Sequence, residues 1–331
     1  RCNKAFLKAG VVKHLLKSCH SVRKLALTGV KPVVYGHQVN GISPTTLQTT
    51  RSTIVGSLGI KKPGGCVTTA MAIHGYLPYD PLVTFRCDVV CAFLEAVVKS
   101  PIKLAITHQW PILAAKLDHA FRWHQVNGPC SATISTLLDI GWRPLSLREW
   151  VDCSGSTWHL DLGDPCLVPQ VKEALAHSIQ STVWQTHAAK HPYAGDIAFG
   201  LDVTVGKRLL ANFTKAKQYR SAWWCDAIMQ GSMHLFAPKH CVNGCCNHCG
   251  QPVEAEQMWE HLAWDCSCPA LLEVPAVAAT QHLARYSSEQ VLVDPLLWLR
   301  GLISANTTFG LTAVPDLHEH PNFDHMRCSH P

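Results

Sequence analysis

Apolar residues recur at the three- to four-residue spacing of amphipathic helices over most of the chain. One stretch, residues 147–162, instead alternates on either side of Ser154 and Gly155, which predicts a β-hairpin. The pattern therefore predicts a mainly α-helical fold with one small β-hairpin. We expect helices near residues 4–17, 43–59, 80–100, 111–128, 131–141, 169–191, 206–231 and 287–303.

The helix expected at 43–59 carries clear start and stop signals. Ser43 is a favourable N-cap and Gly59 a favourable C-terminal stop. A β-branched run precedes it at residues 30–39 and is interrupted by Gly36. The apolar stripe that we expect to be buried consists of Leu47, Ile54 and Leu58.

Changes of pattern divide the chain into five segments. A basic segment is followed by a helical region, and this by the hairpin with further basic helices. A cysteine-rich stretch then precedes a proline-punctuated tail that contains one short helix. The boundaries that we expect are 1–60, 61–145, 146–240, 241–269 and 270–331.

Composition narrows the class of protein. The chain has 331 residues, of which 47% are hydrophobic and 16% charged, and no apolar run is long enough to predict a membrane span. Lysines interrupt the apolar residues at the N-terminus, which argues against a secretory signal. Because the first residue is Arg1, we expect a piece of a longer reading frame. The 16 scattered cysteines indicate reduced thiols inside a cell, with metal binding where they cluster.

Basic residues are unevenly distributed. Residues 1–79 hold eleven Lys or Arg and no Asp or Glu, and the stretch 203–225 is also basic and free of acids. Such stretches attract phosphate backbones, so we expect RNA or DNA as the partner; the alternative is a solvated basic surface without a partner. The expected contacts are Lys4, Lys8, Lys13, Lys17, Arg23, Lys24, Arg51, Lys207, Arg208, Lys215, Lys217 and Arg220.

The first basic segment also predicts an amphipathic helix. Its lysines lie between apolar residues that recur near helical spacing. We expect the apolar face to be formed by Phe6, Leu7, Val11, Leu15 and Leu16. Farther along, Trp223 and Trp224 follow the second basic stretch. A place in the core is the favoured interpretation of these rings, and stacking on bases is the alternative.

Three thiols and one imidazole lie at metal-ligand spacing. Cys246 and Cys249 form a Cys-x2-Cys pair; after eleven intervening residues comes His261, and after four more comes Cys266. Three thiolates and one imidazole suit a closed, tetrahedral, structural Zn²⁺ site. Gly250 can take the positive φ that such a turn needs. A helix should present His261 inward and loosen before Cys266.

Two alternatives to this ligand set remain open. The residues could be free cysteines beside a core histidine, although a complete four-ligand pattern favours zinc. Neighbouring thiols could also replace one of the four ligands. These candidate substitutes are Cys241, Cys245 and Cys268.

The order of these features resembles the region that follows the catalytic palm in reverse transcriptases of non-LTR retrotransposons. Residues 30–59 carry a Tyr35–Gly36 pair, a helix opened by Ser and Pro, and Arg51 before its end. The hairpin, the basic stretch at 207–224 and the CxxCG…EHL…Cys-Pro pattern at 246–269 then follow in family order. The resemblance covers most of the chain, and the Cys/His pattern is its most specific part.

This resemblance implies a thumb-like region, a helical linker and a CCHC zinc knuckle that together hold primer–template or element RNA, in a nuclear protein. The catalytic palm is missing, because no Asp-Asp pair that could hold the two metal ions occurs in the chain. We therefore expect no polymerase activity from this chain alone.

Other functions carry less weight. Asp152, with Glu173 and Asp196, superficially resembles a ribonuclease H metal site, but a turn role explains Asp152 better. The main alternative is a zinc-stabilised structural or protein-interaction module unrelated to polymerases.

Overall fold

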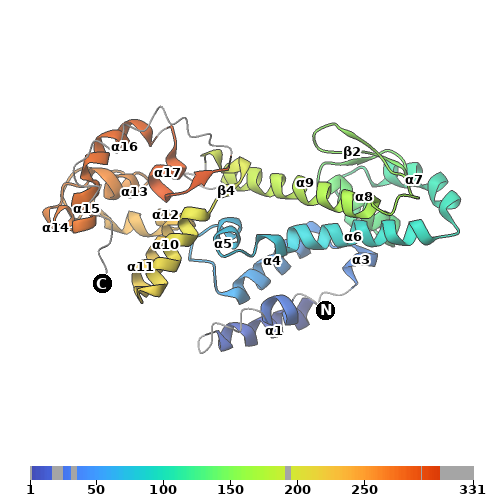
Figure 1. Ribbon diagram of the computed structural model, residues 1–331, viewed down its shortest axis with the longest axis horizontal. Helices are drawn as coiled ribbons and strands as arrows, with labels where there is room; N and C mark the ends of the chain where they lie inside the picture. Colours follow the sequence, from blue (N-terminus) through green and yellow to red (C-terminus); the bar gives the residue numbers. More distant parts are fainter. Residues whose placement is uncertain (1, 17–24, 31–35, 191–194, 292, 306–331) are drawn as a thin grey trace.

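The computed structural model describes residues 2–16, 25–30, 36–190, 195–291 and 293–305. These residues are mainly helical, with three small antiparallel sheets, which confirms the predicted fold class at this level. Two long helices, α6 (Pro81–Lys99) and α9 (Leu167–Lys190), lie along the long axis in Figure 1 and pack against each other. No helix in the described part of the chain is both long and apolar enough to cross a membrane.

The N-terminal helices pack against α6. α1 (Cys2–Leu15) and the turn η2 (Ala26–Val30) lie on α4 (Pro44–Leu58), which in turn contacts α6. The Ser43 hydroxyl accepts a hydrogen bond from the Thr46 N–H at 3.4 Å, and Gly59 ends the helix at φ 63°. The predicted stripe of Leu47, Ile54 and Leu58 is fully buried.

The buried face of α1 differs from the prediction. Leu7 and Val11 are 74% and 60% exposed, whereas Val12 and the smaller Ala5 and Ala9 face the core. Small side chains allow the α1 backbone to approach α4 closely, and tertiary packing thus outweighs hydrophobic periodicity.

The β-branched run at 30–39 is helical where it is described. α3 (His37–Asn40) packs against α6, with His37 buried 4.4 Å from the Phe85 ring and its Nε2 atom 3.3 Å from Asp88 Oδ2. These contacts override the local β preference, which depends strongly on context. Residues 31–35 lie outside the described part.

The largest core lies between α6, α9 and the elements that connect them. These are α7 (Lys103–Leu117), η5 (Arg122–Gln125), α8 (Pro129–Asp139), β1 (Arg143–Pro144), β2 (Glu149–Val151) and β3 (Thr157–His159). α7 begins eight residues before the expected start at Pro111 and contains this proline. Trp110 anchors it, because the buried indole donates to Pro144 O at 3.1 Å. This core joins residues on both sides of the expected boundary at 145/146.

The predicted hairpin is present as β2 and β3, with β1 as a third strand and Trp150 opposite Trp158. Asp152 closes its turn by accepting hydrogen bonds from Ser154 N, Ser156 N and Trp158 Nε1 at 2.8, 3.0 and 3.0 Å. Burial raises the pKa of Asp152, but these hydrogen bonds outweigh it and lower the pKa to about 2. Both carboxylate oxygens are thus engaged in turn contacts, as the turn interpretation predicts.

The elements from α10 onward form the other end of the molecule (Figure 1). The basic stretch forms α10 (Thr204–Lys215) and α11 (Tyr219–Met229), separated at Lys217, whose φ is 58°. The tail helix expected at 287–303 is instead two helices, because the Asp294 carboxylate caps a new helix by accepting from Leu297 N at 3.0 Å. Residues 306–331 lie outside the described part. The other elements are η4 (Leu77–Tyr79), α5 (Val67–Ile73), η6 (Gly195–Phe199), β4 (Leu201–Asp202), α12 (Met233–Phe236), η7 (Ala237–His240), α14 (Pro269–Leu272), α15 (Pro275–Thr280), η9 (Gln281–Leu283), α16 (Ala284–Gln290), α17 (Pro295–Arg300) and β7 (Ile303–Ser304), which pairs with β4.

Candidate metal centre and basic surfaces

A tight hairpin positions the first two candidate ligands. β5 (Cys241–Val242) and β6 (Cys245–Cys246) pair across a turn at Asn243 and Gly244, both with positive φ. Past β6, Cys246 O accepts from Gly250 N, and Cys246 N donates to Gln251 O, each at 2.8 Å. These bonds fold the chain back so that Cys249 lies beside Cys246. Gly250 has a φ of 75°, as predicted.

A distorted helix supplies the other two candidate ligands. The short helix α13 (Met258–Glu260) continues into the π-helical turn η8 (His261–Asp265), and Cys266 follows in an extended conformation. The wider turn and the extended residue return the Cys266 thiol toward His261. The prediction that the helix loosens before Cys266 is confirmed.

The four side chains form one compact donor set. The Sγ atoms of Cys246, Cys249 and Cys266 and a ring nitrogen of His261 all lie within 4.8 Å of one another. Cys246 Sγ and Cys266 Sγ are 4.0 Å apart, and Cys249 Sγ is 3.3 Å from His261 Nε2. Ideal tetrahedral coordination of Zn²⁺ places two sulfurs about 3.8 Å apart and a sulfur and nitrogen about 3.6 Å apart. The cluster can therefore hold a metal ion with little rearrangement.

The four candidate ligands differ in how deeply they are buried and in the pKa of their thiols. Cys246, His261 and Cys266 are buried around the fully buried Met258, while Cys249 lies nearer the surface. The Gln251 backbone N–H, followed by neighbouring side chains, lowers the pKa of Cys249 to about 6. Burial raises the pKa of Cys266 to about 12. Metal binding must therefore displace a proton from Cys266, as thiolate ligation generally requires.

The three possible substitute thiols lie outside this donor set. Within the described residues, only the four predicted ligands form a group of His, Cys, Asp or Glu side chains able to share one ion. The Cys241 thiol instead contacts the Val253 carbonyl at 3.3 Å. Cys245 and Cys268 are half-buried beside the cluster without joining the group.

Most of the described basic residues in the predicted contact set are exposed. Those on α1 are exposed, and the Lys8 ammonium is 3.4 Å from the Gly29 carbonyl. Those on α10 and at the start of α11 are likewise exposed. Together they are Lys4, Lys8, Lys13, Lys207, Arg208, Lys215, Lys217 and Arg220. Lys17, Arg23 and Lys24 lie outside the described residues.

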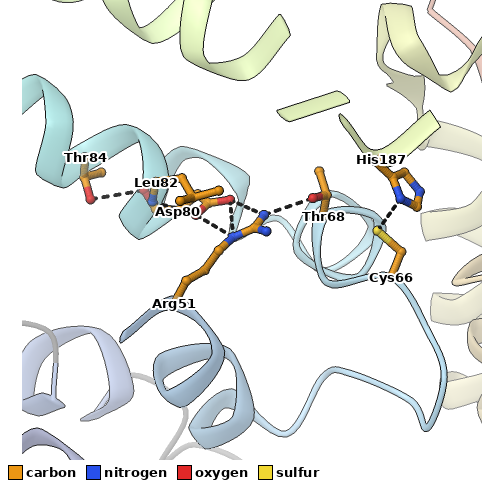
Figure 2. Close-up of polar contacts among 7 residues, drawn as sticks. All are labelled: Arg51, Cys66, Thr68, Asp80, Leu82, Thr84 and His187. Atoms are coloured by element: carbon orange, nitrogen blue, oxygen red, sulfur yellow. Dashed lines mark hydrogen bonds and ion pairs between the residues drawn. The ribbon is translucent and has the colours of Figure 1, made fainter. Parts of the chain in front are cut away.

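Arg51 is the exception and corrects the prediction. Its side chain is buried in α4 and forms a forked ion pair with Asp80, with Nε–Oδ1 and Nη2–Oδ2 distances of 2.9 and 2.6 Å (Figure 2). Arg51 Nη2 also donates to Thr68 Oγ1 at 2.9 Å. The guanidinium is thus occupied inside the protein, so Arg51 links α4, α5 and α6 instead of contacting a phosphate.

A buried Cys–His pair was not singled out by the sequence. Cys66 Sγ lies 3.0 Å from His187 Nδ1 (Figure 2). On the other side of the ring, His187 Nε2 lies 3.3 Å from Thr69 Oγ1. Thr69 also accepts from the buried Arg300 guanidinium, which donates to Met229 O. Cys66 and His187 are 4% and 5% exposed, so the pair belongs to a buried polar network that joins α5, α9, α11 and α17. Cys66 and His187 are 121 positions apart in the sequence, so no local sequence signal reveals the pair.

Comparisons with protein-family models, curated proteins and solved structures find no match to this chain.

Proposed function

We propose that this chain binds nucleic acid as the C-terminal part of a reverse transcriptase of the non-LTR retrotransposon type. Its basic helices grip the phosphate backbone of template and primer or of element RNA, and the palm that performs polymerisation lies in the parent protein. The chain itself has no polymerase activity. As in the family that it resembles, we place the parent protein in the nucleus.

The observation that carries this proposal is the exposure of the basic residues on α1, on α10, in the turn after α10 and at the start of α11. All eight that are described have side chains at the surface, and residues 1–79 and 203–225 contain no acid that could neutralise them. An uncompensated positive surface attracts phosphates, and each contact releases counterions.

We further propose that the Cys/His cluster holds a structural Zn²⁺ ion. Cys246, Cys249 and Cys266 would supply thiolates and His261 an imidazole, which completes four-coordination and leaves no position for a substrate. The metal would replace the larger apolar core that this short segment lacks and so stabilise the fold around it. Purification from zinc-supplemented cultures followed by elemental analysis tests this assignment: one zinc per chain is expected, and His261→Ala should lose it.

Binding to a fluorescein-labelled structured RNA, measured by anisotropy across salt concentrations, tests the nucleic-acid proposal. The variant Lys207→Glu/Lys215→Glu reverses two exposed charges on α10. The control Lys116→Glu/Lys172→Glu makes the same change of net charge at exposed positions elsewhere. We expect affinity to fall steeply with salt, and the α10 variant to lower the salt slope by about one for each phosphate that it no longer neutralises.

Two outcomes would overturn the nucleic-acid proposal. One is weak binding that does not respond to salt. The other is an equal loss of affinity in both charge variants, because only the net charge would then matter. Either result would favour the alternative of a zinc-stabilised structural or protein-interaction module.

A further inference from the structure

Three aromatic side chains gather where α11 meets α12. The rings of Trp223 and Trp224 meet edge to face at 4.9 Å, and the Phe236 ring lies 5.9 and 5.7 Å from them. Tyr219 is on the preceding turn of α11. Trp224 is 37% exposed and Tyr219 is 65% exposed. The cluster therefore presents aromatic surface to solvent, unlike the buried tryptophans Trp110, Trp142 and Trp150.

Helical spacing places cations beside these rings. Residues four apart lie on the same helix face, so Tyr219 lies above Trp223 and the exposed Arg220 lies above Trp224. The Lys239 ammonium lies 5.5 Å from the centre of the Phe236 ring. Aromatic and positive groups thus alternate over α11, α12 and η7, the yellow and light-orange elements of Figure 1.

A fixed loop borders the same surface. The loop 61–65 carries the exposed Lys61 and places the Lys62 ammonium 5.5 Å from the centre of the Trp223 ring. Gln230 holds the loop, because its Oε1 atom accepts from Lys62 N at 2.8 Å and its carbonyl accepts from Cys66 N at 2.9 Å. The basic border is therefore held in place on α11.

Negative charge is almost absent from this region. Between Val203 and Val253 the only acid is Asp226. Its carboxylate is 3% exposed and is engaged by Lys62 at 3.0 Å and His74 at 3.1 Å. No other acid of this stretch can neutralise the exposed cations around the rings. The charge of the surface is therefore complementary to phosphate.

We propose that this surface, which we call the aromatic platform (Tyr219, Arg220, Trp223, Trp224, Phe236 and Lys239), binds single-stranded nucleic acid. The proposal rests on the function proposed above and adds the form of the ligand. Tyr219 and Trp224 stack on unpaired bases, while Arg220 and Lys239 contact the phosphates between them. Exposed rings with adjacent cations suit a single strand, because the bases of a duplex are already stacked on each other.

Anisotropy titrations at one fixed salt concentration test the platform. The probes are a labelled 15-nucleotide oligo(U) and an RNA duplex of the same length. The variants are Tyr219→Ala, Trp224→Ala and Trp224→Phe, the last of which keeps a ring. The matched control is Phe121→Ala, which removes a ring that is 74% exposed on a different part of the protein.

We expect Tyr219→Ala and Trp224→Ala each to weaken oligo(U) binding about ten-fold, since one stacked base is lost. Duplex binding should change little, Trp224→Phe should retain most of the affinity, and Phe121→Ala should have no effect. Because Tyr219 is well exposed, its variant keeps the test valid even if Trp224→Ala perturbs folding.

Unchanged oligo(U) affinity in Tyr219→Ala and Trp224→Ala, alongside duplex binding by the wild type, overturns the platform but leaves the proposed function standing. Equal losses for oligo(U) and duplex also overturn it, because stacking on unpaired bases is then not the cause. If the wild type binds neither oligo(U) nor the duplex, the platform and the proposed function are both overturned.

Discussion

Removal of the Asp80 charge should unfold the junction of α4, α5 and α6 more readily than any surface change. The Asp80 carboxylate is fully buried and accepts two short bonds from Arg51. It also caps α6 by accepting from Leu82 N at 2.9 Å. The substitution Asp80→Asn keeps an oxygen for the cap but leaves the Arg51 guanidinium without a counter-charge.

The magnitude follows from burial. Breaking a buried ion pair by removing one partner costs about 3–5 kcal/mol, because the remaining charge is left uncompensated. Arg51 still donates a hydrogen bond to Thr68, so the loss of unfolding free energy in Asp80→Asn should lie near the lower end of this range, at about 3 kcal/mol. Asp80→Ala also loses the cap and should cost about 1 kcal/mol more. In Arg51→Met/Asp80→Asn neither charge of this pair remains buried, so the double variant should be more stable than Asp80→Asn alone.

Urea unfolding followed by circular dichroism, at constant zinc concentration, measures these differences. Asp118→Asn, at an exposed position, is the control and should stay within about 0.5 kcal/mol of the wild type. The reasoning is refuted by a loss below about 1 kcal/mol in Asp80→Asn. It is equally refuted if the double variant is no more stable than the single one.

Two further predictions concern other buried groups. Burial raises the pKa of Asp226, but contacts with His74 and Lys62 outweigh burial, and the net pKa is lowered. The ionised carboxylate therefore stabilises the folded protein fully above about pH 4, and this stabilisation is lost as the pH falls through the lower, folded-state pKa. Asp226→Asn should therefore flatten the acid limb of a plot of unfolding free energy against pH, and an unchanged limb would contradict this. Trp150→Ala removes a fully buried indole whose ring centre lies 6.3 Å from that of Trp110 in a stacked arrangement. The free energy of unfolding, measured with urea, should fall by about 3–5 kcal/mol. A fall of less than about 1 kcal/mol would show that the core can close around the gap.

Local signals predicted the elements whose determinants are close together in the chain. The hairpin around Ser154 and Gly155 depends on a turn, and the stripe of α4 depends on spacing within one helix. The grouping of the four candidate metal ligands was also predictable, because the turn at Gly250 and the spacing of these residues restrict how the chain can fold. In each case, fewer than about twenty-five residues contain all the necessary information.

Tertiary contacts explain the errors. The predicted buried face of α1 was wrong because α1 packs on α4 through the small side chains of Ala5 and Ala9, and the larger Leu7 and Val11 point away. The prediction of a single helix in the tail was wrong because Asp294 acts as an N-cap inside a stretch whose periodicity alone favours one helix. Neither error could be corrected from hydrophobicity, since the deciding partner is a distant helix in one case and a side-chain oxygen in the other.

The fate of the basic residues shows why charge counts need a structure before they become a binding surface. Residues 1–79 contain no acid, yet the first acid after them, Asp80, is committed to Arg51, and Lys62 is committed to Asp226. Two of the unopposed charges therefore serve the fold. The lysines on α1 and the cations on α10 and α11 stay at the surface, and the stretches 1–79 and 203–225 that contain them have no carboxylate to reduce their field. Long-range pairing thus separates the structural cations from those that can meet a phosphate, and only the second group should change the salt dependence of binding.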